Sequence, residues 1–116
     1  MSNQVKKYSQ KILDFTEQNH VQESNYTFAK YANNIAHKIY NRPQYTELAL
    51  KLVNKSLSLY ESANALDTKA HILYKLDQQY EAVKVEQKAI EMCQNYEDRK
   101  KFQKVHQKMY NHERLD

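Results

Sequence analysis

A short run of residues returns in this chain after 34 positions. Ala-His-Lys-Ile-Tyr occupies residues 36–40, and Ala-His-Ile-Leu-Tyr occupies residues 70–74. Downstream, residues 47–57 are echoed by residues 80–90 at a spacing of 33. A period near 34 with two helices per unit is typical of a structural repeat whose copies stack to bury a continuous core. The sequence therefore predicts a series of helical hairpins.

Composition favours the same fold class. The chain has no glycine and one proline, Pro43, among its 116 residues. Without glycine, few positions can take up left-handed backbone conformations at low cost, so tight β-hairpins and phosphate-cradling loops are disfavoured. The chain is rich in Lys, Gln, Glu, Ala and Leu, which are good helix formers. We therefore expect an all-α chain built as one domain, because 116 residues leave no room for two independent cores.

Apolar residues recur at helical spacing through nearly the whole chain and predict about six helices. Ser24 is the expected N-cap of the second helix and Asn95 that of the sixth, and Asp77 with Gln78 marks a tight turn. A polar stretch at residues 20–23 predicts a loop. The expected helices are residues 3–18, residues 25–41, the stretch from Pro43 to about Tyr60, a helix starting near residues 62–64, residues 80–92, and one from Asn95 to at least Met109.

The segment from about Asn33 to Met92 resembles the tetratricopeptide family over two repeats, roughly half of the chain. The second repeat, from Leu66 through Ala82 to Glu91, is the better match. The resemblance implies a right-handed solenoid of antiparallel helix hairpins, with small residues where helices approach closely. These are Ala36 and Ala70, Ala49 and Ala82, and Ser56 and Ala89.

The chain departs from that family in three places. Asp77 stands at the usual glycine of the turn between helices, Glu86 replaces a usual aromatic residue, and the proline that closes each repeat is missing. Residues 62–92 and the helix after them are also similar to the helical C-terminal region of certain bacterial thioredoxin-fold proteins. No redox pair of cysteines accompanies that similarity, so no redox activity carries over.

These patterns divide the single predicted helical-repeat domain into four parts. Residues 1–24 form an N-terminal flanking helix, residues 25–61 the first repeat, residues 62–94 the second repeat, and residues 95–116 a C-terminal capping helix.

In tetratricopeptide domains the first helix of each hairpin lines a concave groove that holds a peptide. The resemblance therefore implies a protein or peptide partner, and it places eight groove positions in this chain. They are Asn33, His37, Tyr40 and Asn41 in the first repeat, and Asp67, His71, Tyr74 and Lys75 in the second. The alternative is that these are ordinary solvated or half-packed residues of a short scaffold.

Nothing in the sequence predicts an enzyme, a metal or a cofactor. No Ser, Cys or carboxylate lies in a nucleophile motif, and the single thiol, Cys93, lacks an identifiable base. The histidines lack metal-ligand spacing, since His106 and His112 are six residues apart on one helix. Acidic residues on the fifth helix are expected to pair with nearby lysines on a solvated face. They are Glu81, Glu86 and Glu91.

The net charge of +4, from 18 basic and 14 acidic residues, is too mild for a dedicated nucleic-acid binder. Lys100, Lys104 and Lys108 form one stripe on the last helix, which suits either an RNA or acidic surface or the polar face of a capping helix. The N-terminus predicts no signal peptide, and no run reaches the roughly 20 apolar residues of a membrane span.

The competing interpretation is a structural appendage of a larger protein or a homo-oligomeric module. Two full repeats with flanking helices approach the minimum of about three stacked units that such folds need. Tyr8, Tyr26 and Phe28 near the N-terminus are candidates for contact with another domain or a second copy of the chain, and core packing explains them equally well.

Overall fold

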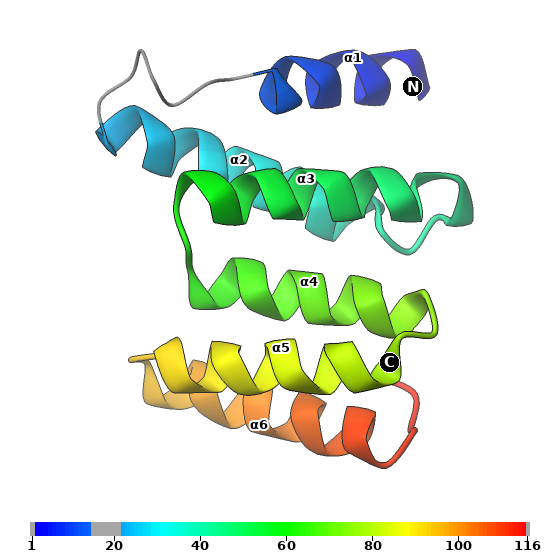
Figure 1. Ribbon diagram of the computed structural model, residues 1–116, viewed down its shortest axis with the longest axis vertical. Coiled ribbons are helices and arrows are strands. Elements are labelled where there is room, and N and C mark those ends of the chain that lie inside the picture. Colours follow the sequence, from blue (N-terminus) through cyan, green and yellow to red (C-terminus); the bar gives the residue numbers. More distant parts are fainter. Residues whose placement is uncertain (1, 15–21, 116) are drawn as a thin grey trace. The chain divides into compact units, whose positions relative to one another are not determined.

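The structure is a computed structural model that describes residues 2–14 and 22–115 (Figure 1). Every regular element in these residues is helical, which confirms the predicted all-α class. The helices are α1 (Ser2–Leu13), α2 (Gln22–Ile39), the short 3₁₀ turn η2 (Pro43–Tyr45), α3 (Thr46–Leu59), α4 (Ala63–Lys75), α5 (Gln79–Met92) and α6 (Tyr96–Tyr110). They fall into two compact units, Met1–Glu61 and Ser62–Asp116, so the unit boundary coincides with the boundary between the two sequence repeats.

The first unit is built on the hairpin of α2 and α3, with α1 in contact with both helices. Ala29 of α2 and Leu59 of α3 form a buried cluster on which Phe28 packs. The buried hydroxyl of Ser56 donates a hydrogen bond of 2.6 Å to the carbonyl oxygen of Ala29. This bond ties α3 to α2 at a point where a larger side chain would hold the helices apart.

The second helix ends before Pro43, two residues earlier than the predicted end at residue 41. Helix α2 stops at Ile39, and Pro43 begins η2, where its missing N–H leaves no helical carbonyl unpaired. The hydroxyl of Thr46 then donates to the carbonyl oxygen of Tyr40 at 2.8 Å, which closes the turn into α3.

The second unit consists of the hairpin of α4 and α5, with α6 packed on α5 (Figure 1). Ser62 caps α4, because its hydroxyl oxygen accepts the Ala65 N–H at 3.1 Å. Asn95 caps α6 in the same way, accepting the Asp98 N–H at 2.9 Å, which confirms the predicted cap.

The turn between α4 and α5 forms around Asp77, as predicted. Asp77 has a φ of 65°, the left-handed conformation that glycine usually supplies at this place. The N–H of Asp77 donates to the Tyr74 carbonyl at 3.1 Å, and the N–H of Gln78 donates to the Leu73 carbonyl at 2.9 Å. This pair of bonds is a Schellman motif, so Asp77 performs the usual role of glycine.

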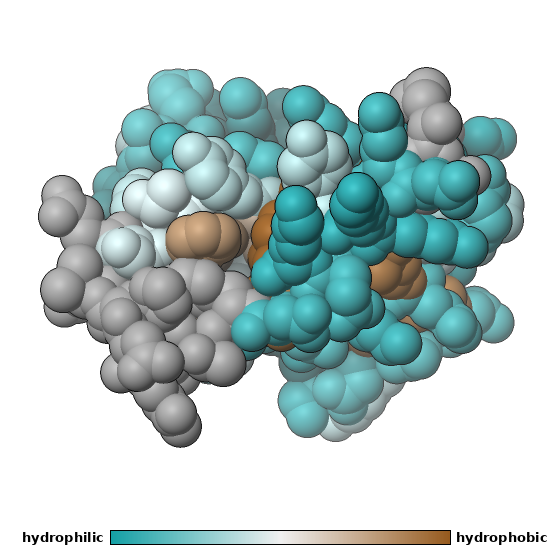
Figure 2. Space-filling model, turned by 90° about the horizontal axis from the view of Figure 1, so that it is seen from above, coloured by the Kyte–Doolittle hydropathy of each residue, from teal (hydrophilic) through white to brown (hydrophobic). Residues whose placement is uncertain are grey.

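The small residues that the sequence placed at helix contacts are in the interior. Ala36, Ala49, Ala70, Ala82 and Ala89 have no exposed surface. Hydrophilic side chains dominate the described part of the face in Figure 2, and hydrophobic side chains show only in small separate areas. Alanines and larger apolar side chains such as Leu52, Ile72 and Met109 together fill the interior.

The start of the second helix was predicted wrongly. Ser24 is not its N-cap, because α2 already begins at Gln22 and includes Ser24 in its first turn. Gln22 and Glu23 are good helix formers and extend the helix into the predicted loop. Helix α1 ends at Leu13, and the predicted helical residues 15–18 lie outside the described residues. Phe15 and residues 20–21 lie outside the described residues.

Within the described residues, every helix is too short or too polar to cross a lipid bilayer.

Candidate functional site

A glutamate lies in the interior of the second unit. Glu86 of α5 has no exposed surface, and neither of its carboxyl oxygens accepts a hydrogen bond from an N–H or hydroxyl group of the described residues. An ionised carboxylate buried in this way loses its hydration without compensation, at a cost of several kcal/mol. The prediction that Glu86 lies on a solvated face beside lysines is therefore wrong, because this position of α5 faces the core.

Burial changes the protonation of Glu86. Desolvation, and then a hydrogen bond to Asp67 and the charge of Asp67, raise the pKa of Glu86 from 4.5 to about 10. At neutral pH the folded chain thus holds Glu86 as a neutral acid, and its proton can be donated to the Asp67 carboxylate.

Asp67 and His71 face Glu86 from α4. They are four residues apart, so they lie one above the other on the same face of the helix. Nδ1 of His71 lies 2.8 Å from the Asp67 carbonyl oxygen and 3.4 Å from Asp67 Oδ1. Oδ1 of Asp67 is itself buried without a hydrogen-bond partner. The side chains of His71 and Asp67 are 15% and 16% exposed, so the cluster reaches the surface on this side.

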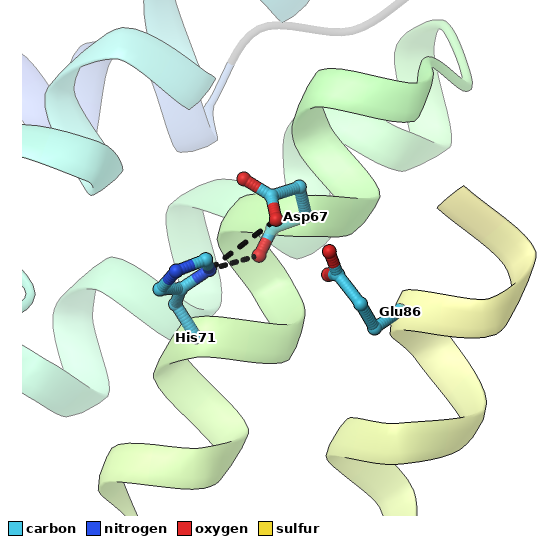
Figure 3. Close-up of side chains that lie close together, drawn as sticks. All are labelled: Asp67, His71 and Glu86. Carbon is cyan, nitrogen blue, oxygen red and sulfur yellow. Dashed lines mark hydrogen bonds and ion pairs between the residues drawn. The ribbon is translucent and has the colours of Figure 1, made fainter. Parts of the chain in front are cut away.

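The three side chains converge on one point. Figure 3 shows the Glu86 carboxyl pointing from α5 toward Asp67, with the His71 ring beside Asp67 one turn along α4. One nitrogen or oxygen atom from each residue lies within 4.8 Å of the other two. Two carboxyl groups and an imidazole at this separation can exchange a proton or hold a cation. We call Asp67, His71 and Glu86 the acid–histidine cluster.

The first hairpin provides an internal comparison. The offsets of 34 for the first helix and 33 for the second match Asp67 to Asn33, His71 to His37, and Glu86 to Val53. Val53 is fully buried, as Glu86 is, and Oδ1 of Asn33 is buried without a partner, as Oδ1 of Asp67 is. The matched positions are therefore buried in both hairpins, and only the second hairpin has two acids there.

The remaining predicted groove residues lie at the surface of their helices. Asn33 and Tyr40 are partly exposed, and His37 and Asn41 are exposed. The rings of His37 and Tyr40 lie side by side, with centroids 6.1 Å apart.

In the second unit Lys75 is exposed, and Tyr74 has a partner within the chain. Its hydroxyl donates a 2.6 Å hydrogen bond to the backbone carbonyl oxygen of Glu113. Burial, and then the charge of Glu113, raise the pKa of the Tyr74 hydroxyl. Asp67 and His71 are therefore in contact with each other, whereas Tyr74 is bonded to a residue after α6.

Sequence reasoning found two members of the acid–histidine cluster and missed the third. Asp67 and His71 were predicted as peptide contacts, but Glu86 was assigned to the solvent. The signal was present in the repeat, because the offset of 33 aligns Glu86 with Val53, a β-branched apolar residue in the middle of α3.

Comparison of the chain with protein-family models, curated proteins and solved structures finds no match.

Proposed function

We propose that this chain is a non-catalytic protein-interaction module that binds a peptide or protein segment along the first helix of each hairpin, α2 and α4. The proposal rests on the residues of these helices and on the repeat they share. It is the function that the tetratricopeptide resemblance implies.

The observation that carries the proposal is the repetition of surface residues as well as core residues. Repeated alanines in the interior are explained by helix packing. His37 and His71, and Tyr40 and Tyr74, also repeat, although each of these side chains keeps some contact with solvent. Packing does not require a histidine and a tyrosine at partly exposed positions, whereas contact with an extended peptide uses such apolar bodies with polar tips.

Selection of binding peptides tests the proposal. The chain would be immobilised and screened against displayed random peptides, and the affinity of each recovered sequence would be measured by fluorescence polarisation. One double variant carries His37→Ala and Tyr40→Ala, and a second carries His71→Ala and Tyr74→Ala. We expect each to weaken peptide binding by about tenfold or more, because truncating residues at the centre of an interface has such an effect.

The matched control is Lys51→Ala with Lys84→Ala, on the second helices. These two lysines are repeat-equivalent and exposed, and they lie outside the proposed contact surface. The control should bind as the unaltered chain does. Equal loss in both sets of variants, or recovery of no binding peptide at all, would contradict the proposal.

A further inference from the structure

We propose that Asp67, His71 and Glu86 form a binding site for one divalent transition-metal ion of the Zn²⁺ type, held between α4 and α5. The site shares Asp67 and His71 with the proposed peptide surface, but it can exist whether or not the chain binds a peptide.

The ligand types favour this class of ion. Carboxylate oxygens and an imidazole nitrogen are ordinary ligands of Zn²⁺, and the imidazole suits first-row transition metals better than Mg²⁺ or Ca²⁺. Ca²⁺ takes about six to eight oxygen ligands, which three side chains with one nitrogen do not provide. Three protein ligands leave the fourth position of a tetrahedral ion to water.

The geometry is near that of a bound ion. With ligands about 2.0–2.2 Å from Zn²⁺, the ligand atoms of a tetrahedral site lie roughly 3.3 Å apart. The three candidate atoms here lie within 4.8 Å of one another. We expect side-chain rotations of Glu86 and His71 to close this difference.

The strongest observation is the set of buried oxygens without partners. Both oxygens of Glu86 and Oδ1 of Asp67 lie in the interior, and no N–H or hydroxyl group of the described residues donates a hydrogen bond to them. Buried polar atoms are nearly always satisfied, and an unsatisfied group in a native fold calls for an ion or another explanation. A divalent cation would balance two ionised carboxylates and coordinate oxygens from both helices.

His71 is arranged to act as the third ligand. Its Nδ1 lies 2.8 Å from the Asp67 carbonyl oxygen, which is only an acceptor, so Nδ1 carries the proton and Nε2 holds the lone pair. Metal-bound histidines commonly donate their second N–H to a carbonyl or carboxylate in this way. A rotation of the ring that gives up this hydrogen bond would direct a nitrogen lone pair to the ion. The partly exposed side chains of Asp67 and His71 provide the entry path.

The test is a metal titration of the chain after treatment with EDTA. Co²⁺ would be added as a spectroscopic substitute for Zn²⁺, and Zn²⁺ would then be added to displace it. We expect one equivalent of Co²⁺ to produce the visible absorption of a four- or five-coordinate ion, and Zn²⁺ to remove it. Glu86→Gln and Asp67→Asn keep the shape of each side chain and should weaken Zn²⁺ binding by at least about tenfold, because even residues that merely support a ligand contribute that much.

His37→Ala is the matched control, since the equivalent place in the first hairpin has Asn33 and Val53 in place of the acids. Its Co²⁺ spectrum and Zn²⁺ affinity should equal those of the unaltered chain. Circular dichroism would verify that each variant is folded. The proposal is overturned if the unaltered chain gives no such spectrum, or if Glu86→Gln and Asp67→Asn, both folded, bind Zn²⁺ as tightly as it does. No peptide is used, so failure here leaves the interaction proposal untouched.

Discussion

Glu86 stands in the second hairpin where Val53 stands in the first, and neither side chain has any exposed surface. Val53 shows that this position can hold an apolar side chain. The backbone therefore does not require an acid at Glu86. Replacing a core valine with a carboxyl group sacrifices stability. The chain therefore carries at Glu86 a group whose presence packing alone does not explain.

The first prediction concerns the pH dependence of stability, measured in EDTA. Since burial raises the pKa of Glu86 from 4.5 to about 10, its effect on stability is most favourable below pH 4.5, where folded and unfolded chains both hold the proton. As the pH rises from 4.5 toward 10, the unfolded chain releases this proton and the folded chain keeps it, so the free energy of unfolding falls. At pH 7 the loss amounts to roughly 3 kcal/mol.

Glu86→Gln removes this titration and should stabilise the chain increasingly as the pH rises. Urea unfolding followed by circular dichroism at pH 4 and pH 8 measures the difference. Glu81→Gln changes an exposed glutamate on the same helix and serves as the control. Identical pH profiles for the Glu86→Gln variant and the unaltered chain would show that Glu86 is not held neutral.

A second prediction concerns the turn between α4 and α5. Asp77 has a φ of 65°, and a side chain in this conformation introduces steric strain that glycine avoids. Asp77→Gly should raise the free energy of unfolding by about 0.5–1 kcal/mol, and Asp77→Val should lower it by about 1–2 kcal/mol. Urea unfolding is again the measurement. Equal stability of the two variants would mean that the backbone at residue 77 is not left-handed.

A third prediction concerns the hydrogen bond between the two helices of the first hairpin. Ser56→Ala deletes the buried donor to the Ala29 carbonyl and should lower the free energy of unfolding by about 1 kcal/mol. Ser58 makes only a local bond to the carbonyl of Lys55 at the surface, so Ser58→Ala should change stability by less than about 0.5 kcal/mol. Equal effects of these two substitutions in thermal unfolding would contradict the buried bond.

A fourth prediction compares two serines that both resemble helix caps in the sequence. Ser62 accepts the Ala65 N–H, so Ser62→Ala should lower the free energy of unfolding by about 1 kcal/mol. Ser24 lies inside α2, where alanine is the better helix former, so Ser24→Ala should leave stability unchanged or raise it slightly. Hydrogen exchange of the first turn of α4 offers a local check, since loss of the cap should speed exchange there.

The sequence predicts those parts of the fold that depend on local signals. Pro43 ends a helix because of its ring and its missing N–H, and Asn95 begins one because its side chain accepts a backbone N–H. Ser24 failed as a signal because the residues before it propagate a helix as readily as those after it. A cap residue has predictive value only where the preceding residues resist helix formation.

The candidate site was less predictable because it depends on which face of α5 turns inward. Charged residues at helical spacing are usually solvated, so Glu81, Glu86 and Glu91 were treated alike. Glu81 and Glu91 are exposed, and Glu91 accepts a hydrogen bond from Gln87, whereas Glu86 is buried. The spacing alone does not separate these cases; the alignment of Glu86 with a buried valine in the other repeat does.

The hydrogen bond from Tyr74 to the Glu113 carbonyl has a consequence for any ligand of α4. The chain's own Glu113 carbonyl accepts the hydrogen bond of the Tyr74 hydroxyl. A carbonyl of a bound peptide would have to replace it. Because Glu113 belongs to the same chain, this internal competitor is always present, whatever the concentration of the protein. A peptide that uses Tyr74 must first displace it, so its apparent affinity is lowered by the fraction of time that the hydroxyl is engaged. The surface of the second hairpin alone would thus overstate its affinity for a peptide. The fraction of molecules in which the Tyr74 hydroxyl is free depends on how often the residues after α6 release it.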